Sequence, residues 1–308
     1  MLATHFPGIR TIVLDRNYGF TGGYNRAMAR LLSGPGPRPE YLLLLNSDIL
    51  VEPGWLDRLT DYMDTHPECG VCGPKLLALT HKDDAYIQTD RLEYAGAAGG
   101  YIDRFGYPFC RGRVLSRTDV DGPGYSSVKD VLWVSGACLM TRASLWEESG
   151  GLDERFFAHM EEIDYCWRAQ LAGHRVRVVP SSRVWHLGGG TLPRTSATKL
   201  RLNYRNGLLL LDNNLAPTIG RFKARVRIIT RLVLDDCSAL VYLLVGKTDF
   251  CGSVFRAHRE YRRLRKVPHK AVSRNGDVRG VAPVCIIPQS LLRGERIFDY
   301  LRRYEDSH

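Results

Sequence analysis

Long apolar runs and a secretion signal are both missing from this sequence. The longest apolar stretches, residues 41–45 and 239–245, fall far short of the roughly 20 residues that a membrane-spanning helix needs. The opening residues, MLATHFPGIR, contain neither a basic segment followed by an apolar one nor a small-residue cleavage site. We therefore expect a protein that stays in the cytoplasm and does not span a membrane.

Cysteine is sparse and lacks the spacing of a disulfide framework or a zinc site. The eight cysteines are scattered, and most lie in apolar stretches, which is typical of reduced core thiols. Only Cys69 and Cys72 form a C-x-x-C pair, and no second pair lies nearby. A zinc or redox centre is therefore disfavoured.

The motifs of nucleic-acid-binding modules and of phosphate-binding loops are also absent. The formal net charge of +10 favours contact with polyanions, but the basic residues crowd into the C-terminal third, and no zinc finger or RNP motif occurs. We therefore expect no nucleic-acid partner. A sugar nucleotidyltransferase would need a glycine-rich, lysine-bearing loop near its N-terminus, and this loop is missing too.

What is present is the composition of a folded protein in which strands and helices alternate. Hydrophobic residues make up 44% and charged residues 25% of the 308 residues, close to the averages for globular domains. Periodicity predicts strands over residues 11–14 and 41–45, with a helix over residues 24–32 between them. A further helix opens at Pro53 and ends near His66.

The later elements continue this alternation. In chain order we expect a strand over 71–79, loops with short strands over 80–127, a strand over 131–141, helices over 143–148 and 160–171, and a strand over 175–179 that Pro180 stops. This order predicts an α/β fold with a mixed, mostly parallel sheet flanked by helices. Because the pattern becomes helical and basic beyond about residue 200, we divide the chain into residues 1–205 and a helical, basic C-terminal region over 206–308.

The first polar cluster, Asn46, Ser47 and Asp48, ends the strand over residues 41–45 abruptly. Ligands of open α/β sheets lie beyond the carboxyl ends of strands, where a carboxylate can coordinate a hard cation that also binds phosphate oxygens. The alternative is an Asx turn that caps the helix opened by Pro53. Taken alone, the two interpretations have about equal weight.

A second cluster lies in the segment FFAHMEEIDYCWR, residues 156–168. On a helix, Glu161, Asp164 and Arg168 share one face, whereas Glu162 points about a quarter-turn away. We interpret Asp164 and Arg168 as an i,i+4 ion pair. Glu162 has no such partner, and acids among aromatic residues are costly to bury unless ions or substrate hydroxyls satisfy them. Glu162 is therefore a candidate general base.

The third feature is His186, which follows a strand and precedes Gly188, Gly189, Gly190 and Thr191. A glycine loop after a strand leaves backbone amides free for an anionic ligand. A lone histidine is more often a satisfied structural residue, so the sequence leaves both interpretations of His186 open.

Five segments occur in an order that resembles family 2 glycosyltransferases of the GT-A fold. They are LDRNYGFTGGYNRAMA, LLLLNSDILVEPGWLDRL, EYAGAAGGYIDRFGYPFCRGR, VLWVSGACLMTRASLWEESGGLDERFFAHMEEIDYCWRAQLAGHRVRVVPSSRVWHLGGGT and LNYRNGLLLL. More narrowly, they are similar to the rhamnosyltransferase-like branch of bacterial polysaccharide biosynthesis. The resemblance covers about residues 10–265, and five motifs in the right order are hard to match by chance.

The resemblance implies roles for single residues. Asp48 stands in the family's D-x-D-type motif as the ligand of metal and diphosphate. Because Asn46 replaces the first acid of that motif, the ligands of the metal would be Asp48, water and His186. Glu162 occupies the position of the catalytic base. The nucleotide-sugar pocket would contain Asn17, Gly19, Gly23, Asn25, Asn46 and Asp48, and the acceptor side Glu161, Trp167 and Arg168.

The implied activity is transfer of a sugar from a nucleotide-diphosphate donor to a hydroxyl group by an inverting single displacement. A Mg²⁺ or Mn²⁺ ion would neutralise the charge that grows on the leaving diphosphate. The expected acceptor is a glycan or a lipid-linked intermediate of polysaccharide biosynthesis.

The segment over residues 221–265 alternates apolar stretches with arginines, as expected of helices on an anionic membrane surface. We therefore expect peripheral attachment to the inner face of the cell membrane. A helical cap whose arginines face water explains the same pattern nearly as well.

Members of this family normally begin with a strand, a helix and a second strand that carries an acidic residue contacting the nucleoside. Here the strand over residues 11–14 follows Met1 by about ten residues, so we expect this unit to be missing and donor binding to be weak or absent. A misassigned start or a real truncation would account for it. The alternative function is a catalytically impaired relative that acts only as a binding or scaffold protein.

Overall fold

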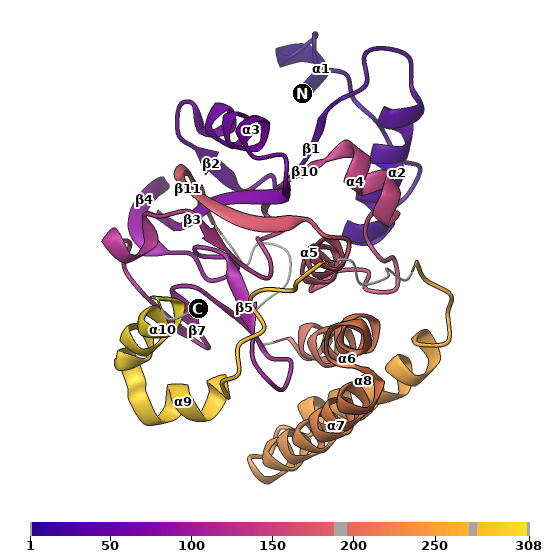
Figure 1. Ribbon diagram of the computed structural model, residues 1–308, viewed down its shortest axis with the longest axis vertical. Helices are drawn as coiled ribbons and strands as arrows, with labels where there is room; N and C mark the ends of the chain where they lie inside the picture. The colour runs from indigo at the N-terminus through magenta and orange to yellow at the C-terminus, as the bar shows by residue number, and fades with distance from the viewer. Residues whose placement is uncertain (1, 188–195, 271–275, 307–308) are drawn as a thin grey trace.

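The chain folds into a mixed central sheet with helices on its faces, a smaller sheet, and a layer of long helices (Figure 1). The computed structural model describes residues 2–187, 196–270 and 276–306. Within them, the central sheet contains β1 (Tyr41–Leu45), β2 (Ile49–Val51), β3 (Cys69–Lys82), β4 (Ala85–Leu92), β9 (Lys129–Asp130), β10 (Cys138–Arg142) and β11 (Arg175–His186). The smaller sheet contains β5 (Gly100–Ile102), β6 (Pro108–Cys110), β7 (Arg113–Val114) and β8 (Arg117–Thr118).

The helices cover both sheets and form the separate layer. They are α1 (Leu2–His5), α2 (Gly19–Ser33), α3 (Trp55–Thr65), α4 (Ala143–Ser149), α5 (Glu161–Leu171), α6 (Ala197–Ile219), α7 (Arg221–Leu244), α8 (Thr248–Leu264), α9 (Ile286–Arg293) and α10 (Ile297–Asp306), with short 3-10 turns η1 (Pro123–Tyr125) and η2 (Gly294–Arg296).

The central sheet has the strand order β1-β10-β3-β11-β2, with β4 beside β3 and β9 beside β11. The mixed α/β architecture is confirmed, but the sheet is not mostly parallel: among its described strands, only β3 and β11 pair in parallel. The strands β1, β3 and β11 do run in one direction, as strands joined by helical crossovers do. The difference arises because β10 returns from the excursion over residues 93–137 and inserts antiparallel between β1 and β3.

Helices α3 and α5 cover opposite faces of this sheet. Leu59 and Met63 of α3 are fully buried against a cluster that includes Met140 of β10, and each contributes about 1.5–3 kcal/mol by leaving water. On the other face, the hydroxyl group of Tyr165 in α5 lies 2.7 Å from that of Thr141. Since neighbouring strand residues point to opposite faces, β10 separates the two helices.

The C-terminal segment packs on the smaller sheet. Ile102 of β5 forms a parallel bridge with Val281, and the buried Arg111 Nε lies 2.7 Å from Glu305 Oε2. Figure 1 shows α9 and α10 beside this sheet, apart from the layer of α6, α7 and α8. The sequence boundary at residue 205 falls inside α6, which runs unbroken from Ala197 to Ile219. None of the helices in the described residues is both long and apolar enough to be a membrane span.

Three predicted strands differ from the structure. Residues 11–14 are not a strand: Val13 is 78% exposed, and β propensity alone cannot form a strand without a neighbour to pair with. Pro180 does not stop β11, because it lies at an irregularity in the pairing with β3, where a proline costs no ladder hydrogen bond. The strand predicted over 131–141 begins only at Cys138, since residues 136–137 form a turn.

Candidate active site

Polar side chains meet where β1 and β11 end at the same edge of the sheet. Asp48 Oδ1 lies 3.3 Å from His186 Nε2, and Asn46 Nδ2 lies 3.4 Å from the same nitrogen. His186 Nδ1 lies 3.4 Å from Glu93 Oε1. The structure therefore brings together Asn46, Asp48 and His186, as the sequence suggested, and adds Glu93. The alternative Asx cap is not formed, because the N-cap of α3 is Gly54 and no side chain caps it.

Glu93 is the residue of this cluster that the sequence analysis missed. Its side chain is buried, and its backbone amide bonds to the carbonyl of Leu76 in β3. Burial by itself would lower the pKa of His186, but Glu93 and Asp48 outweigh it and raise that pKa. The available signal was the place of Glu93 at the start of the EYAGAAGG motif, to which no role was assigned.

The donor set of this cluster fits a cation that arrives together with a diphosphate. Asp48 keeps 29% of its side chain exposed, next to the buried His186. Among the described residues, no group of three or more histidine, cysteine or acidic side chains is arranged to hold a metal ion. At phosphate sites Mg²⁺ typically takes only one or two protein carboxylates and completes its shell with phosphate oxygens and water. Asp48 and His186 would supply the protein's share of such a shell.

Two acidic residues at the start of α5 carry carboxylate oxygens that the described structure leaves unsatisfied. The Oε2 atoms of Glu161 and Glu162 are buried and have no hydrogen-bond partner there. Burial raises the pKa of Glu161 well above its usual range, and the charge of Glu162 raises it further. Burial also raises the pKa of Glu162, to about 7, while backbone amides at the start of the helix limit the rise. Both carboxyl groups therefore keep their protons to a higher pH than free glutamate side chains do.

The turn that precedes α5 is strained. Phe157, His159 and Met160 have φ angles of 65°, 72° and 70°, a left-handed conformation that costs a residue with a side chain roughly 1–2 kcal/mol. Such strain persists only where the surroundings impose it, and it concentrates at functional sites. Burial lowers the pKa of His159 to about 4, and its buried Nε2 has no partner in the described part of the chain.

Helix α6 holds this turn in place through Asn206 and Arg205. The fully buried Asn206 donates from Nδ2 to the carbonyl oxygens of residues 156, 158 and 159 at 3.2, 2.8 and 2.7 Å. Arg205 donates to the carbonyl of Phe156 at 2.7 Å and to Asn206 Oδ1 at 2.8 Å. Both residues belong to the LNYRNG motif, which the sequence analysis quoted without giving it a function.

The N-terminus of α2 closes on the same turn. The amide of Thr21 donates to the carbonyl of Phe157 at 3.3 Å. A Cβ atom on Gly19 would lie 2.6 Å from ring carbons of Phe157 and 2.9 Å from its carbonyl oxygen, so only glycine fits there. Asn17 Oδ1 accepts from the amide of Gly19 at 2.8 Å, which fixes the entry to α2. Asn17 and Gly19 therefore lie against the turn that carries the acidic pair.

Short contacts connect the acidic pair to the end of β1. The turn over residues 136–137 accepts a hydrogen bond from the amide of Asn46 at the carbonyl of Ala137, 2.9 Å away. Its neighbour Gly136 faces Phe20 and the Cβ atom of Glu162, and a Cβ there would lie 3.3 and 3.5 Å from them. The strand-end cluster and Glu162 are thus separated by one turn of the chain.

Two other residues proposed for the nucleotide-sugar pocket differ in their surroundings. Asn25 uses both ends of its amide on Leu152, with Nδ2 2.8 Å from the carbonyl and Oδ1 2.9 Å from the amide nitrogen. Its side chain is thereby engaged within the fold. Gly23 is half-buried, and a Cβ atom on it would meet no other atom within 4 Å.

Trp167 and Arg168 do not lie on an acceptor side, because both are buried inside the fold. Trp167 is fully buried and donates from Nε1 to Thr218 at 3.0 Å. The predicted ion pair is confirmed: Arg168 Nε lies 2.7 Å from Asp164 Oδ2, with both side chains buried. An apolar indole and an internally paired guanidinium are satisfied by the core, so Glu161 is the remaining acceptor-side candidate.

The cysteines are free, and the predicted glycine loop is not among the described residues. All eight cysteines lie within the described residues and are free thiols there. Burial raises the pKa of Cys69 to about 12, so Cys69 is not a reactive thiolate. The glycine loop over residues 188–191 lies outside the described residues.

The sequence is similar to those of known glycosyltransferases. The model of the family described as "Glycosyltransferase like family 2" matches residues 2–207. An N-acetylglucosaminyl-diphospho-decaprenol L-rhamnosyltransferase of Mycobacterium tuberculosis is 26% identical over 211 residues, which are 67% of this chain and 67% of that protein. Rhamnosyltransferase WbbL of Escherichia coli is 28% identical over 186 residues, covering 60% and 66% of the two chains.

Solved structures of glycosyltransferases show a weaker likeness. A crystal structure of GalNAc-T7 with UDP, GalNAc and Mn²⁺ has a TM-score of 0.45 at 14% identity, over 65% of this chain and 35% of that one. A mannosyltransferase of Pyrobaculum calidifontis with GDP-Man and Mn²⁺ has a TM-score of 0.42 at 10% identity, over 84% and 71%. The family match, which covers more than half of the sequence, shows that the chain belongs to glycosyltransferase family 2.

Proposed function

We propose that this glycosyltransferase moves a deoxyhexose or hexose from a nucleotide-diphosphate sugar to a hydroxyl group of a glycan or lipid-linked acceptor, with inversion at the anomeric carbon. The names of two relatives support a rhamnose-like donor, and one of them names a decaprenol diphosphate sugar as its substrate. The observation that carries the proposal is the pair of unsatisfied, buried carboxylates at the start of α5.

Glu162 acts as the general base in this proposal. Because burial raises its pKa to about 7, it is close to the value at which a base is effective near neutral pH. Its carboxylate takes the proton of the acceptor hydroxyl as that oxygen forms a bond to the anomeric carbon. The bond from this carbon to the diphosphate breaks at the same time, and the nucleoside diphosphate leaves with the bonding electrons. No covalent bond to the enzyme forms.

Glu161 complements this role because it remains protonated. A neutral carboxyl group can donate a hydrogen bond, and the raised pKa of Glu161 keeps it neutral at the pH where Glu162 is ionised. We assign it to a sugar hydroxyl beside the reacting carbon. Two acids in different charge states at adjacent positions therefore divide proton removal and substrate orientation between them.

The strand-end cluster would hold the diphosphate side of the donor. Asp48 and His186 are the residues that would bind a Mg²⁺ or Mn²⁺ ion, and such an ion stabilises the charge on a leaving diphosphate by several kcal/mol. The turn over residues 156–160, which Asn206 holds, would keep Glu162 near this end of the sheet, because residues 136–137 contact both Glu162 and Asn46. Residues 2–207 would thus contain the donor side and the base.

Mass spectrometry of purified protein with a panel of nucleotide sugars and polyprenyl-diphosphate-linked acceptors tests this proposal. We expect Glu162→Gln to lower the turnover rate by about 10²-fold or more with donor affinity unchanged, and Glu161→Gln to lower it less. Glu154→Gln, an exposed acid beside α2, is the matched control and should retain turnover.

Other outcomes would contradict this assignment. A product with retained anomeric configuration, seen by NMR, would exclude the single displacement. Loss of turnover that is larger in Glu161→Gln than in Glu162→Gln would move the base to Glu161. Acceptor binding without transfer of any sugar would instead favour a catalytically impaired relative that serves as a binding protein.

A further inference from the structure

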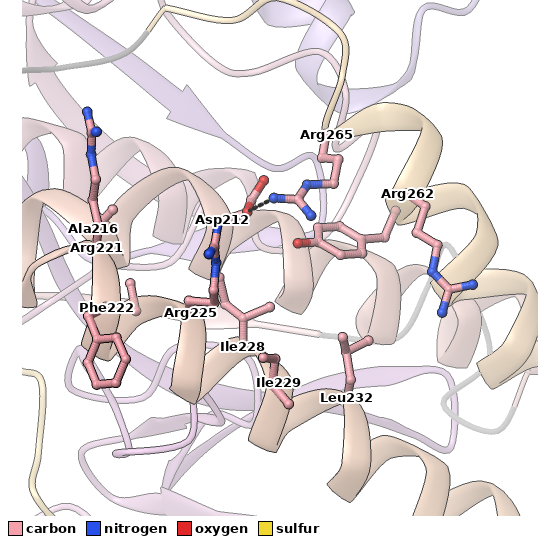
Figure 2. Close-up of a pocket in the computed structure, with 12 residues that line it drawn as sticks. Asp212, Ala216, Arg221, Phe222, Arg225, Ile228, Ile229, Leu232, Arg262 and Arg265 are labelled. Carbon is pink, nitrogen blue, oxygen red and sulfur yellow. Dashed lines mark hydrogen bonds and ion pairs between the residues drawn. The ribbon is translucent and has the colours of Figure 1, made fainter.

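A groove of about 700 Å³ opens between α6, α7 and α8, and Figure 2 shows the side chains that line it. Its floor is apolar and includes Ala216, Ile228 and Leu232. Its rim carries four arginines, which are Arg221 and Arg225 of α7, Arg262 of α8 and Arg265 immediately after it. An apolar floor below a basic rim is the chemistry of a site for an amphiphile with an anionic head.

Most of the positive charge at this rim is unpaired. Arg265 Nη2 lies 3.0 Å from Asp212 Oδ1, the contact drawn in Figure 2. No hydrogen bond or ion pair joins the side chain of Arg221, Arg225 or Arg262 to another described residue. The hydroxyl group of Tyr261, which also lines the groove, faces Asp212. The groove therefore offers several donors that the chain itself does not use.

An exposed apolar ridge runs along α7 from the mouth of this groove. At 100° per residue its members fall within an arc of about 60°. They are Phe222 (81% exposed), Val226, Ile229, Val233, Leu240 and Leu244 (77% exposed). On the helical wheel Arg221 and Arg225 flank this arc on one side and Lys223 on the other. The opposite side of α7 is buried, and there Arg231 pairs with Asp235 at 2.8 Å.

We propose that the ridge and the groove together dock on an anionic lipid bilayer. The ridge would enter the boundary between headgroups and acyl chains, and the guanidinium groups of the rim would bind headgroup phosphates. Basic flanks beside an apolar stripe are the signature of a helix that lies in the plane of a membrane surface. A nucleic acid would leave the apolar ridge in water, and a second copy placed rim to rim would bring arginines against arginines.

The position of this surface on α6 links it to the candidate site. Asp212 lies six residues after Asn206 on the same helix, which is about 9 Å along the axis. Docking through the groove would therefore keep the turn over residues 156–160 within a short distance of the headgroups, where a lipid-linked acceptor would be presented. The docking itself needs neither donor nor acceptor, so its test is independent of the proposed transfer.

Vesicle co-sedimentation of the full chain tests the inference. We expect binding to vesicles of phosphatidylglycerol and phosphatidylcholine at 0.1 M salt and no binding to phosphatidylcholine alone. The double variant Arg225→Ala/Arg262→Ala should weaken binding about 30-fold, the loss expected for two arginines at an anionic surface. Arg259→Ala/Arg263→Ala removes the same charge from exposed positions of α8 that do not line the groove, and it should weaken binding much less.

A second pair of measurements separates lipid from other occupants. Phe222→Ser/Leu244→Ser leaves the charge unchanged and should also weaken vesicle binding, with the circular dichroism spectrum unchanged. Equal losses in the two arginine pairs would overturn the inference, because they would indicate diffuse attraction without a site. Inorganic pyrophosphate that competes fully with vesicles, and binds Phe222→Ser/Leu244→Ser as tightly as the parent, would also overturn the inference. A dimer in light scattering that dissociates in this variant would overturn it too.

Discussion

Replacing Asn206 should reduce catalysis by releasing the strained turn, although Asn206 need not touch substrate. Its Nδ2 atom donates hydrogen bonds to three carbonyl oxygens within residues 156–159. Each buried acceptor left without a partner costs about 1–3 kcal/mol of stability. With at least two acceptors left without a partner in Asn206→Ala, the loss is roughly 2–6 kcal/mol. The left-handed Phe157, His159 and Met160 hold a similar amount of strain, about 1–2 kcal/mol each. The turn should therefore relax, and α5 should begin in a different place.

The expected result is a decrease in turnover of about 10²-fold in Asn206→Ala, because a displacement near 1 Å of a catalytic group has this scale of effect. Asn214→Ala is the matched control: Asn214 is equally buried on the same helix, but it donates to Asp164 and Leu210 and not to the turn. Both variants should lose stability in urea titrations. At matched folded fractions, only Asn206→Ala should lose turnover and shift the pH dependence that Glu162 causes. Equal losses of turnover in the two variants would refute the positioning role.

Three further predictions concern charge. Turnover should rise with pH through about 7, because Glu162 must lose its proton to act as a base. Folding raises the pKa of Glu162 from 4.5, so the protonated carboxyl group contributes fully to folding stability below pH 4.5, and this contribution is lost as the pH rises through 7. Glu162→Gln should therefore melt at a higher temperature than the parent at pH 8. Asp48→Asn should abolish Mn²⁺-dependent turnover and weaken Mn²⁺ binding in calorimetry, and unchanged affinity would exclude Asp48 as a ligand. Arg168→Ala should cost about 3–5 kcal/mol of stability by leaving Asp164 unpaired in the core, with the acceptor KM of the folded fraction unchanged.

Local chemistry was enough to predict several elements of the fold. The apolar run over residues 41–45 forms β1, and the periodic segment after Met160 forms α5, because burial of a regular stripe or run dominates short-range preference. The i,i+4 spacing of Asp164 and Arg168 also predicted their ion pair. Strands whose pairing depends on distant partners were less predictable: residues 11–14 have β-forming side chains but form no strand, and β11 continues through Pro180 because β3 pairs with it on both sides of an irregularity.

The sequence by itself determined the family, the alternation of strands and helices, and the candidates Asp48, Glu162 and His186, because these depend on residue order and on motifs that can be read without coordinates. Only the tertiary structure decided what surrounds them. Glu93 reaches His186 across 93 positions of the chain, and Asn206 reaches the turn over residues 156–160 from α6. Trp167 lies on the same helix as Glu162 but is fully buried. Helical spacing cannot distinguish a face turned to substrate from a face turned to the core, since that depends on which element packs against it.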